Sequence, residues 1–449
     1  MLALRLMSQP GAGEISRFVK WTICVVAAVG FLFDIYVVLV GPLIVQPALA
    51  ELGNLQPGTP DYRAWAGELF WIPPLVGGFC GLWGGYLADR FGRRRILTWS
   101  ILLYAFSAVA SGLATRLEAL LLFRTLSFAG VCVEFVAATA WLAEIFMHPR
   151  TREAVLGSTQ AFSSLGGVLA AGAFYLANHY AGALPQIQSG HSAWRYTLIS
   201  GIAPALPLIL IRPFLPESTQ WERKRASGTL KRPSVFDLFH VKFRRTTVVT
   251  SLLFACAYGA AFGSIQQSPQ ITPGLTEVER MTPAARGEAV SSVQAFQEMG
   301  GLLGRIVMAG LALFLASRRK LLRVFLIPGL VITPIVFTYN ATHGLSMFRL
   351  GIFLAGFTTV AQLTFWGNYL PRVYPVHLRG TGEGFAANVG GRMFGTSAAY
   401  ITTHLAAWMP GAAPPVKLAY ASATVGALVY ALALVLTRRL PEPPAKLLD

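Results

Sequence analysis

The sequence predicts an all-α membrane protein with twelve transmembrane helices in two repeats of six, and with both termini in the cytoplasm. The first observation is composition: 54% of the 449 residues are hydrophobic and only 13% are charged, whereas a soluble domain carries about 25% charged residues. The second is a series of apolar runs near the bilayer-spanning length of about 20 residues. The third is that basic residues gather in alternate loops, as expected for loops that stay in the cytoplasm.

Twelve apolar runs meet the length requirement. They lie near residues 20–46, 67–89, 95–114, 117–146, 153–181, 195–214, 246–271, 288–316, 321–339, 345–370, 380–408 and 416–437. The longest connecting segment, residues 216–245, contains eight lysines and arginines and is expected to be cytoplasmic. We therefore divide the chain into an N-terminal half at 1–215, a linker at 216–245 and a C-terminal half at 246–449.

The two halves repeat each other weakly. Shifting the chain by 225 residues aligns residues 310–320 with residues 85–95: a glycine and a basic end are shared, but Phe314 stands opposite Asp89. Two sets of six helices with a basic loop at corresponding places indicate a transporter built from repeats.

Other classes of protein fit the sequence poorly. The formal charge of +17 comes from bases in short loops, so no nucleic-acid partner is expected. The four cysteines lie in apolar runs and the histidines form no ligand cluster, so neither disulfide nor metal is expected. There is no phosphate-binding Gly-x-x-x-x-Gly-Lys-[Ser/Thr] motif and no long soluble segment. We expect no cofactor and no enzyme activity, and a protein that acts as a monomer in the lipid bilayer.

Ionisable residues inside the apolar runs are the candidates for function, because each costs roughly 2.5–3.5 kcal/mol to insert and so needs a reason to be there. Six lie well inside runs, three in each half: Asp34, Arg124, Glu134, Glu298, Arg305 and Arg392.

Asp34 and Glu134 are the candidates for proton coupling. Asp34 has apolar neighbours along its run, which disfavour the charged form of a carboxyl group. The alternative for Asp34 is a structural hydrogen bond to a neighbouring helix. For Glu134 the alternative is an ion pair with a residue of another helix. Arg124 cannot be that partner within one helix, because it is ten positions away and lies on a different helix face.

The three buried arginines are the first candidates for substrate contact, because a guanidinium binds two carboxylate or phosphate oxygens at once. The alternative is that these arginines form structural ion pairs with Asp34, Glu134 or Glu298 on other helices of the bundle. Glu298 lies on the same stripe as Arg305, seven residues away, so both can line one cavity. Polar side chains in neighbouring runs complete the predicted substrate set, namely Gln266 and Asn388.

Specific segments resemble a known family. The loop at residues 85–95 resembles the signature loop of the major facilitator superfamily. The other matching positions are Arg124, Glu144 and Arg152 around the fourth run, Pro216–Trp221 after the sixth, and Tyr374–Phe385 with Asn388 at the eleventh. The last segment is similar to proton-coupled symporters of sialic acid, sugar acids and other carboxylates. The sequence departs from this pattern at Arg392, which lies one residue late, after the doubled Gly390–Gly391.

The resemblance implies the major facilitator fold, in the plasma (inner) membrane, and alternating access. It favours proton symport of a small organic anion or a sugar-like metabolite. Proton-coupled efflux of drugs or metabolites remains an alternative, whereas a non-transporting membrane sensor would need a soluble output domain. It also implies a gating latch between the halves, formed by Gly85, Asp89, Arg90, Gly92, Arg93, Glu144 and Arg152.

Overall fold

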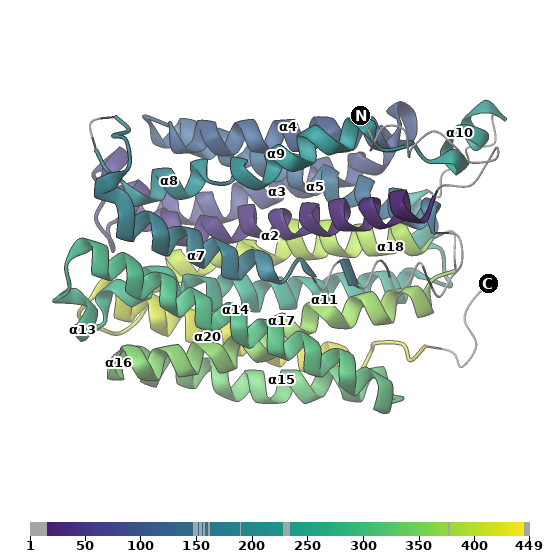
Figure 1. Ribbon diagram of the computed structural model, residues 1–449. Helices are drawn as coiled ribbons and strands as arrows, with labels where there is room; N and C mark the ends of the chain where they lie inside the picture. Colours follow the sequence, from purple (N-terminus) through teal and green to yellow (C-terminus); the bar gives the residue numbers. More distant parts are fainter. Residues whose placement is uncertain are drawn as a thin grey trace.

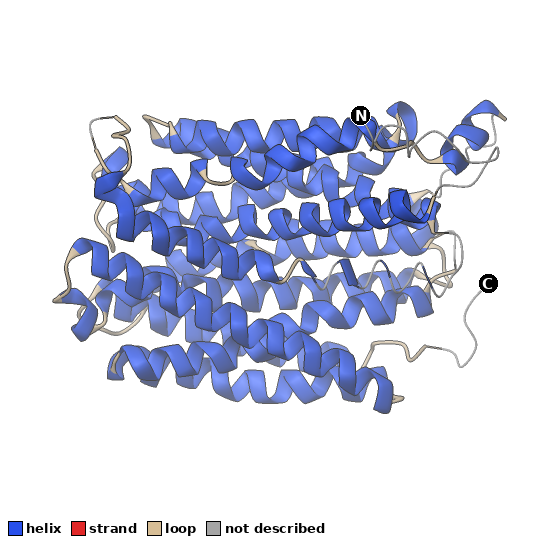
Figure 2. Ribbon diagram, viewed as in Figure 1, coloured by secondary structure: helices blue, strands red, loops and turns tan. Residues whose placement is uncertain are grey.

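The computed structural model describes residues 16–146, 151, 155, 158–159, 162–188, 190–227, 234–375 and 378–443. Within these ranges the chain is helical throughout, apart from turns, loops and one isolated backbone bridge between Ile187 and Gly190 (Figure 2). This confirms the predicted all-α class for the described part of the chain.

The N-terminal helices begin at polar capping residues. The Ser16 side chain accepts the N–H of Val19 at the start of α2, and the Thr59 side chain accepts that of Tyr62 at the start of α3. The set comprises α2 (Arg17–Gly53), α3 (Pro60–Phe91), α4 (Arg93–Gly112), α5 (Leu117–Ile145), α7 (Leu165–Tyr180), η1 (Ala181–Ala183), α8 (Ala193–Ile199), α9 (Ile202–Ile211) and η2 (Arg212–Phe214).

The basic linker contains two short helices, α10 (Thr219–Ala226) and η3 (Val235–Phe239). The C-terminal helices follow, with π-helical turns in η6 and η7. They are α11 (Arg244–Gly263), η4 (Ile265–Gln267), α12 (Ser268–Ile271), η5 (Thr272–Gly274), α13 (Thr276–Glu279), α14 (Pro283–Phe314), α15 (Arg318–Ile335), η6 (Val336–Asn340), α16 (Ala341–His343), α17 (Leu345–Val373), α18 (Arg379–Phe385), η7 (Ala386–Gly395), α19 (Ser397–Leu405), η8 (Ala406–Trp408) and α20 (Pro414–Thr437).

Seven described helices or helix runs are long and apolar enough to cross a membrane. The second and eighth predicted spans correspond to α3 and α14, each 32 residues long. The sixth span is divided among α8, α9 and η2, and the eleventh among α18, η7 and α19. Part of the fifth span lies outside the described residues. The presence of twelve transmembrane helices therefore remains a prediction.

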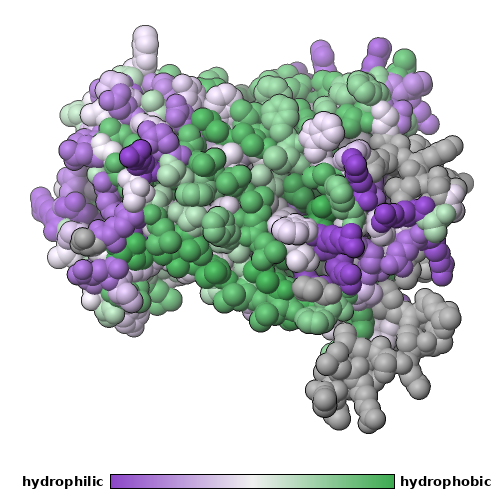
Figure 3. Space-filling model, turned by 90° about the horizontal axis from the view of Figure 1, so that it is seen from above, coloured by the Kyte–Doolittle hydropathy of each residue, from purple (hydrophilic) through white to green (hydrophobic). Residues whose placement is uncertain are grey.

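The long helices lie side by side in one bundle (Figure 1). The start of α2, α10 and the residues after α20 lie at one end, which we call the terminal end; α13 and α16 lie at the other, the distal end. Hydrophobic side chains cover the middle of the molecular surface and hydrophilic ones gather toward both ends (Figure 3). Many large hydrophobic side chains are exposed, Trp99, Phe106 and Leu428 among them, as expected for a surface that faces lipid.

The buried apolar side chains form one cluster mainly within the N-terminal helices and two within the C-terminal helices. The two helix sets meet where α7 packs against α14, and where α3 packs against α19 and η7. The space between the sets is where several of the candidate side chains converge.

Candidate functional site

A cavity of about 210 Å³ lies between the N-terminal and C-terminal helices. Its wall is largely apolar, with aliphatic side chains and seven aromatic ones, namely Phe31, Phe128, Phe135, Phe254, Tyr258, Phe262 and Trp366. Five ionisable side chains interrupt this wall: Asp34, Glu298, Arg305, Glu383 and Arg392. Four of these were predicted from the sequence, and they come from helices α2, α14 and η7, which lie far apart along the chain.

Asp34 projects from the middle of α2 into this cavity and is only 4% exposed. Neither carboxyl oxygen has a hydrogen-bond partner among the described residues. It lies within electrostatic reach of Glu134, Arg392 and Arg212. A buried carboxyl group without a hydrogen bond is unfavourable as an anion, so Asp34 is suited to binding and releasing a proton.

Glu298 and Arg305 line the cavity from the same face of α14, as their spacing predicts. The Gln294 and Gln297 side chains donate hydrogen bonds to Glu298 Oε1, at 2.9 and 3.0 Å. The other oxygen of Glu298 faces Gly167 of α7, so this carboxyl group reaches across to the N-terminal helices. Arg305 has a buried Nε without a partner among the described residues, which leaves this donor available for a ligand.

Arg392 enters the cavity from η7 and is held by Asn388. Its Nη1 donates to Asn388 Oδ1 at 2.6 Å, and its guanidinium lies 5.5 Å from the centroid of the Phe135 ring. Asn388 itself does not line the cavity but lies against Gly81 of α3, where a Cβ would fall 2.6 Å from Asn388 Oδ1. Asn388 is therefore a support for Arg392. Gln266, by contrast, lines the cavity directly.

Two predicted residues lie outside the cavity lining. Arg124 donates from Nη1 to the Val37 carbonyl of α2 at 3.0 Å, beside Gly41, so its position does not support the predicted substrate contact. Glu134 forms a buried ion pair with Arg212 of η2, with Arg212 Nη2 and Glu134 Oε1 2.6 Å apart. Of the two interpretations that the sequence allows for Glu134, this geometry favours pairing.

Arg212 and Glu383 were not among the predicted site residues. Both lie near the ends of predicted spans, where charges are common, but the structure buries Arg212 and places the half-buried Glu383 in the cavity lining. Arg195 behaves similarly: its guanidinium binds Glu51 and the carbonyls of Gly112 and Ala114. For a charge within about a turn of a span boundary, the sequence does not show whether the side chain is exposed in the loop or enclosed by neighbouring helices.

The loop at residues 85–95 forms an ion-pair network at the terminal end. Arg93 Nη2 lies 2.6 Å from both Asp89 Oδ1 and Glu144 Oε1. Gly92 has φ +99°, a conformation that side chains other than glycine rarely adopt, and it joins α3 to α4. The structure thus brings together four of the predicted latch residues, but all four belong to the N-terminal helices α3, α4 and α5 or their junction, so this network does not itself join the two halves.

The remaining latch residues are placed differently. Arg90 donates to the Tyr86 hydroxyl and lies over the Phe91 ring. Gly85 makes an ordinary contact with Val136, in which a Cβ would lie 3.7 Å from Val136 Cγ1. Arg152 lies outside the described residues.

Glu217 and Glu442 cap equivalent helices in the two repeats. Glu217 accepts the N–H groups of Arg93 and Arg94 at the start of α4. Glu442 accepts those of Arg318 and Arg319 at the start of α15. Both acids follow a proline and lie 225 residues apart, the same shift that relates the two basic loops. Carboxylates are favourable at helix N-termini, so the role of each of these two glutamates is to stabilise the start of a helix.

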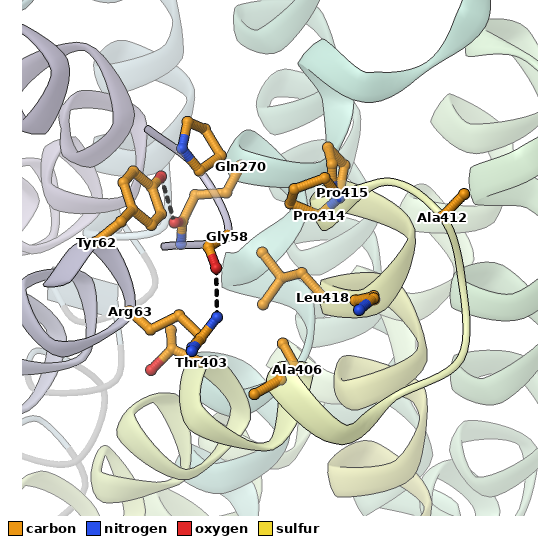
Figure 4. Close-up of a pocket in the computed structure, with 13 residues that line it drawn as sticks. Gly58, Tyr62, Arg63, Gln270, Thr403, Ala406, Ala412, Pro414, Pro415 and Leu418 are labelled. Carbon is orange, nitrogen blue, oxygen red and sulfur yellow. Dashed lines mark hydrogen bonds between the residues drawn. The ribbon is translucent and has the colours of Figure 1, made fainter. Parts of the chain in front are cut away.

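At the distal end, polar contacts join the two helix sets. The Tyr62 hydroxyl donates to Gln270 Oε1 at 2.9 Å, and His179 Nδ1 lies 2.9 Å from Glu288 Oε1. Figure 4 shows the Tyr62–Gln270 bond at the edge of a second, smaller cavity of about 130 Å³. At the other side, the lining of the central cavity reaches Glu383 in α18, near the terminal end.

This architecture defines a class of protein: a multi-pass helical membrane transporter with a central cavity between two helix sets. Residues 24–399 match the sequence profile of the Major Facilitator Superfamily. The chain therefore belongs to this superfamily, which confirms the resemblance found in the sequence. Members of the superfamily are transporters, not enzymes.

Relatives with assigned descriptions are metabolite transporters. A probable 4-methylmuconolactone transporter of Cupriavidus pinatubonensis is 29% identical over 316 residues, which cover 69% of this chain and 68% of the relative. A sialic acid transporter of Escherichia coli is 24% identical over 71% of each chain. A cis,cis-muconate transport protein of Acinetobacter baylyi is 24% identical over 69% of this chain and 71% of the relative.

Solved structures share the fold. The chain resembles the xylose transporter of Escherichia coli with a TM-score of 0.69 and 18% identity, over 95% of this chain and 98% of that one. A D-xylose-proton symporter gives a TM-score of 0.71, also at 18% identity, over 95% and 99% of the two chains. At this identity the likeness establishes the fold and not the substrate.

Proposed function

We propose that this protein is a proton-coupled symporter of a small organic anion that works by alternating access. The observation that carries the proposal is the central cavity, where Asp34 meets Arg305 and Arg392. In this proposal Asp34 accepts the proton, and the two guanidinium groups bind the carboxylate of the substrate. Glu298 and Gln266 complete the polar part of the site. Glu134 holds Arg212, and Arg124 holds α2.

The charges of the cavity support coupling between proton and anion. Its lining contains three carboxyl groups and two guanidinium groups, so full ionisation leaves one negative charge in excess. A substrate anion would add a second negative charge to a poorly solvated space, which is unfavourable. Protonation of Asp34 removes one negative charge, so proton binding and anion binding favour each other. Such linkage is reciprocal and is what a symporter requires.

The lining favours an anion with an apolar or unsaturated body over a neutral sugar. Seven aromatic side chains line the cavity, two of which, Tyr258 and Trp366, carry a polar group; its other neutral polar side chains are Ser163, Ser164, Gln266 and Thr396. A sugar would need hydrogen bonds for each hydroxyl that it buries, because unpaired buried polar groups are costly. Aromatic walls instead suit a flat conjugated acid or lactone. The descriptions of the muconate and methylmuconolactone relatives agree with this class.

The proposed topology has twelve spans in two halves, residues 1–215 and 246–449, joined by a cytoplasmic linker at 216–245. Both termini lie in the cytoplasm, and the protein is a monomer of the inner membrane. The terminal end then faces the cytoplasm, and the distal contacts Tyr62–Gln270 and His179–Glu288 close the outer side. The Asp89–Arg93–Glu144 network acts as part of the inner latch when the cavity faces outward.

Proton-coupled efflux is the second candidate function, because the same site can exchange a proton for an outgoing solute. Purified protein in liposomes separates the two. Uptake of aromatic monocarboxylates, dicarboxylates of the muconate type, sialic acid and neutral sugars is measured with and without an inward proton gradient. Symport predicts that the gradient accelerates uptake of a carboxylate, whereas antiport predicts that an inward gradient drives its exit.

Asp34→Asn tests the role of the proton acceptor. We expect the variant to lose gradient-driven uptake while retaining counterflow exchange of the same anion, because exchange needs no net proton movement. Asp61→Asn is the matched control, since Asp61 is exposed near the start of α3. Unchanged gradient-driven uptake in Asp34→Asn would refute the role assigned to Asp34.

A further inference from the structure

The eleventh predicted span contains a π-helix, η7, at Ala386–Gly395. The N–H of Thr396 bonds to the carbonyl of Gly391, five residues earlier, at 3.1 Å. Each such turn holds one residue more than an α-helical turn, and π-helical turns are rare and frequent at functional sites. The doubled Gly390–Gly391, which places Arg392 one residue later than the family pattern, lies inside this segment.

Both glycines lie directly against α11. A Cβ on Gly390 would collide with the carbonyl of Ser251, and one on Gly391 would fall 2.9 Å from the Tyr258 ring. A side chain at residue 390 would require the backbones of η7 and α11 to move apart, and one at residue 391 would require the Tyr258 ring to shift. The wide turn therefore lets two successive residues press their backbones onto the neighbouring helix.

Arg392 follows the two glycines and lines the central cavity. Its hydrogen bond to Asn388 spans four residues within the π-helix. The N-terminal helices hold the next residue, since the Trp71 indole of α3 donates to the Met393 carbonyl at 3.1 Å. The direction of Arg392 is thus fixed from both sides, by α11 behind the glycines and by α3 in front.

We propose that the Gly390–Gly391 doubling, through the π-helix that contains it, aims Arg392 into the cavity and thereby determines the affinity for an anionic substrate. The inference rests on the proposed function, because it assumes that Arg392 binds the substrate anion. In a regular helix one residue corresponds to about 100° of rotation. Removing one glycine turns Arg392 by that angle toward the place of Gly391, where the Tyr258 ring leaves no room for a guanidinium.

Deletion of one glycine tests this inference, and deleting Gly390 or Gly391 gives the same chain. The matched control is deletion of the exposed Phe394, which shortens the same helix by one residue but keeps both glycines, the spacing from Asn388 to Arg392 and the Met393 carbonyl. We expect the glycine deletion to raise KM for anion uptake about tenfold or more, the loss expected for a charge-assisted hydrogen bond. The Phe394 deletion should change KM much less.

A second measurement reports the direction of residue 392 without transport. Cys24, Cys80, Cys132 and Cys256 are replaced by serine, and Arg392→Cys is introduced with and without the glycine deletion. A water-soluble, negatively charged thiol reagent should label this cysteine readily in the full-length chain. In the shortened chain labelling should slow about tenfold or more, as expected for a side chain that turns about 100° away from the cavity.

The outcomes separate this inference from the proposed function. If Arg392→Gln leaves the affinity for the anion unchanged, the substrate role of Arg392 is wrong. If Arg392→Gln weakens binding but the glycine deletion changes neither KM nor labelling, only the role of the doubled glycine is overturned. Should the shortened chain fail to fold, Gly391→Ala carries the test: its Cβ presses on Tyr258, so KM should rise and labelling should slow.

Discussion

Replacing Glu134 by glutamine distinguishes a structural role for this residue from a role in proton coupling. Glu134 is 0% exposed and Arg212 is 2% exposed, and their charged atoms lie 2.6 Å apart. Removing one member of such a pair leaves a buried charge without compensation, which costs about 3–5 kcal/mol. Because glutamine keeps the shape and one hydrogen-bond acceptor, we expect Glu134→Gln to lower the free energy of unfolding by about 3 kcal/mol.

The assay is denaturant-induced unfolding of the protein in a mild detergent, followed by tryptophan fluorescence. The double variant Glu134→Gln/Arg212→Gln should recover to within about 1 kcal/mol of the parent protein, because a neutral pair leaves no unpaired charge. Glu118→Gln serves as the control, since Glu118 belongs to the same helix but is exposed.

The opposite result would refute the structural role. In that case the free energies of unfolding of Glu134→Gln and Glu118→Gln would differ by no more than about 0.5 kcal/mol, as expected of a surface substitution. The pH dependence of uptake by Glu134→Gln would be altered at the same time. Glu134 would then be the proton-coupling residue that the sequence also allows, and its pairing with Arg212 would be of little consequence for stability.

Three further predictions follow from contacts at the two ends of the bundle. Asp89→Asn should slow transport without changing the ratio of uptake rates for two competing substrates; a changed ratio would contradict the latch. Burial disfavours the charged Glu442 carboxylate, but hydrogen bonds from Ser317 and from the N–H groups of Arg318 and Arg319 outweigh it, so the pKa of Glu442 lies below its ordinary value. Its stabilising contribution is therefore complete above the ordinary carboxyl pKa of about 4.3 and is lost as pH falls through the lower pKa. Glu442→Gln should accordingly be less stable than the parent at neutral pH and equal to it in strong acid; an equal deficit at both pH values would contradict this assignment. Cysteines at Asn178 and Gly287, whose side-chain positions meet at the distal end, should form a disulfide that stops transport until it is reduced; continued transport by the oxidised variant would contradict alternating access.

Much of the central site was predictable because a charge in the middle of an apolar run needs compensation. This reasoning identified Asp34, Glu298, Arg305 and Arg392, all of which line the cavity. The same reasoning does not fix the direction of a side chain around its helix. Arg124 shows the difference: it is as deeply placed as the others, but it faces α2 and binds a backbone carbonyl.

The residues that sequence reasoning missed lie where a charge is unremarkable. Arg212 and Glu383 are near the ends of predicted spans; packing of η2 against α4 helps to bury Arg212, whereas Glu383 of α18 is half-buried at the cavity. The π-helix has a weak sequence signal in the doubled glycine before Arg392, which appeared as a departure from the family pattern. Its consequence for geometry depends on α11, a helix about 130 residues earlier in the chain, and could not be derived from the local sequence.

The hydrogen bond between the Trp71 indole and the Met393 carbonyl makes the intrinsic fluorescence of Trp71 a reporter of the contact between the two helix sets. The Trp71 indole also lies 5.7 Å from the Tyr400 ring, so its surroundings are made by helices of both sets. Separation of α3 from η7 and α19 would break this hydrogen bond and admit water to the indole. With Trp71 kept and the remaining nine tryptophans replaced by phenylalanine, a red shift of its emission would follow the opening of the distal side in real time, without any attached label.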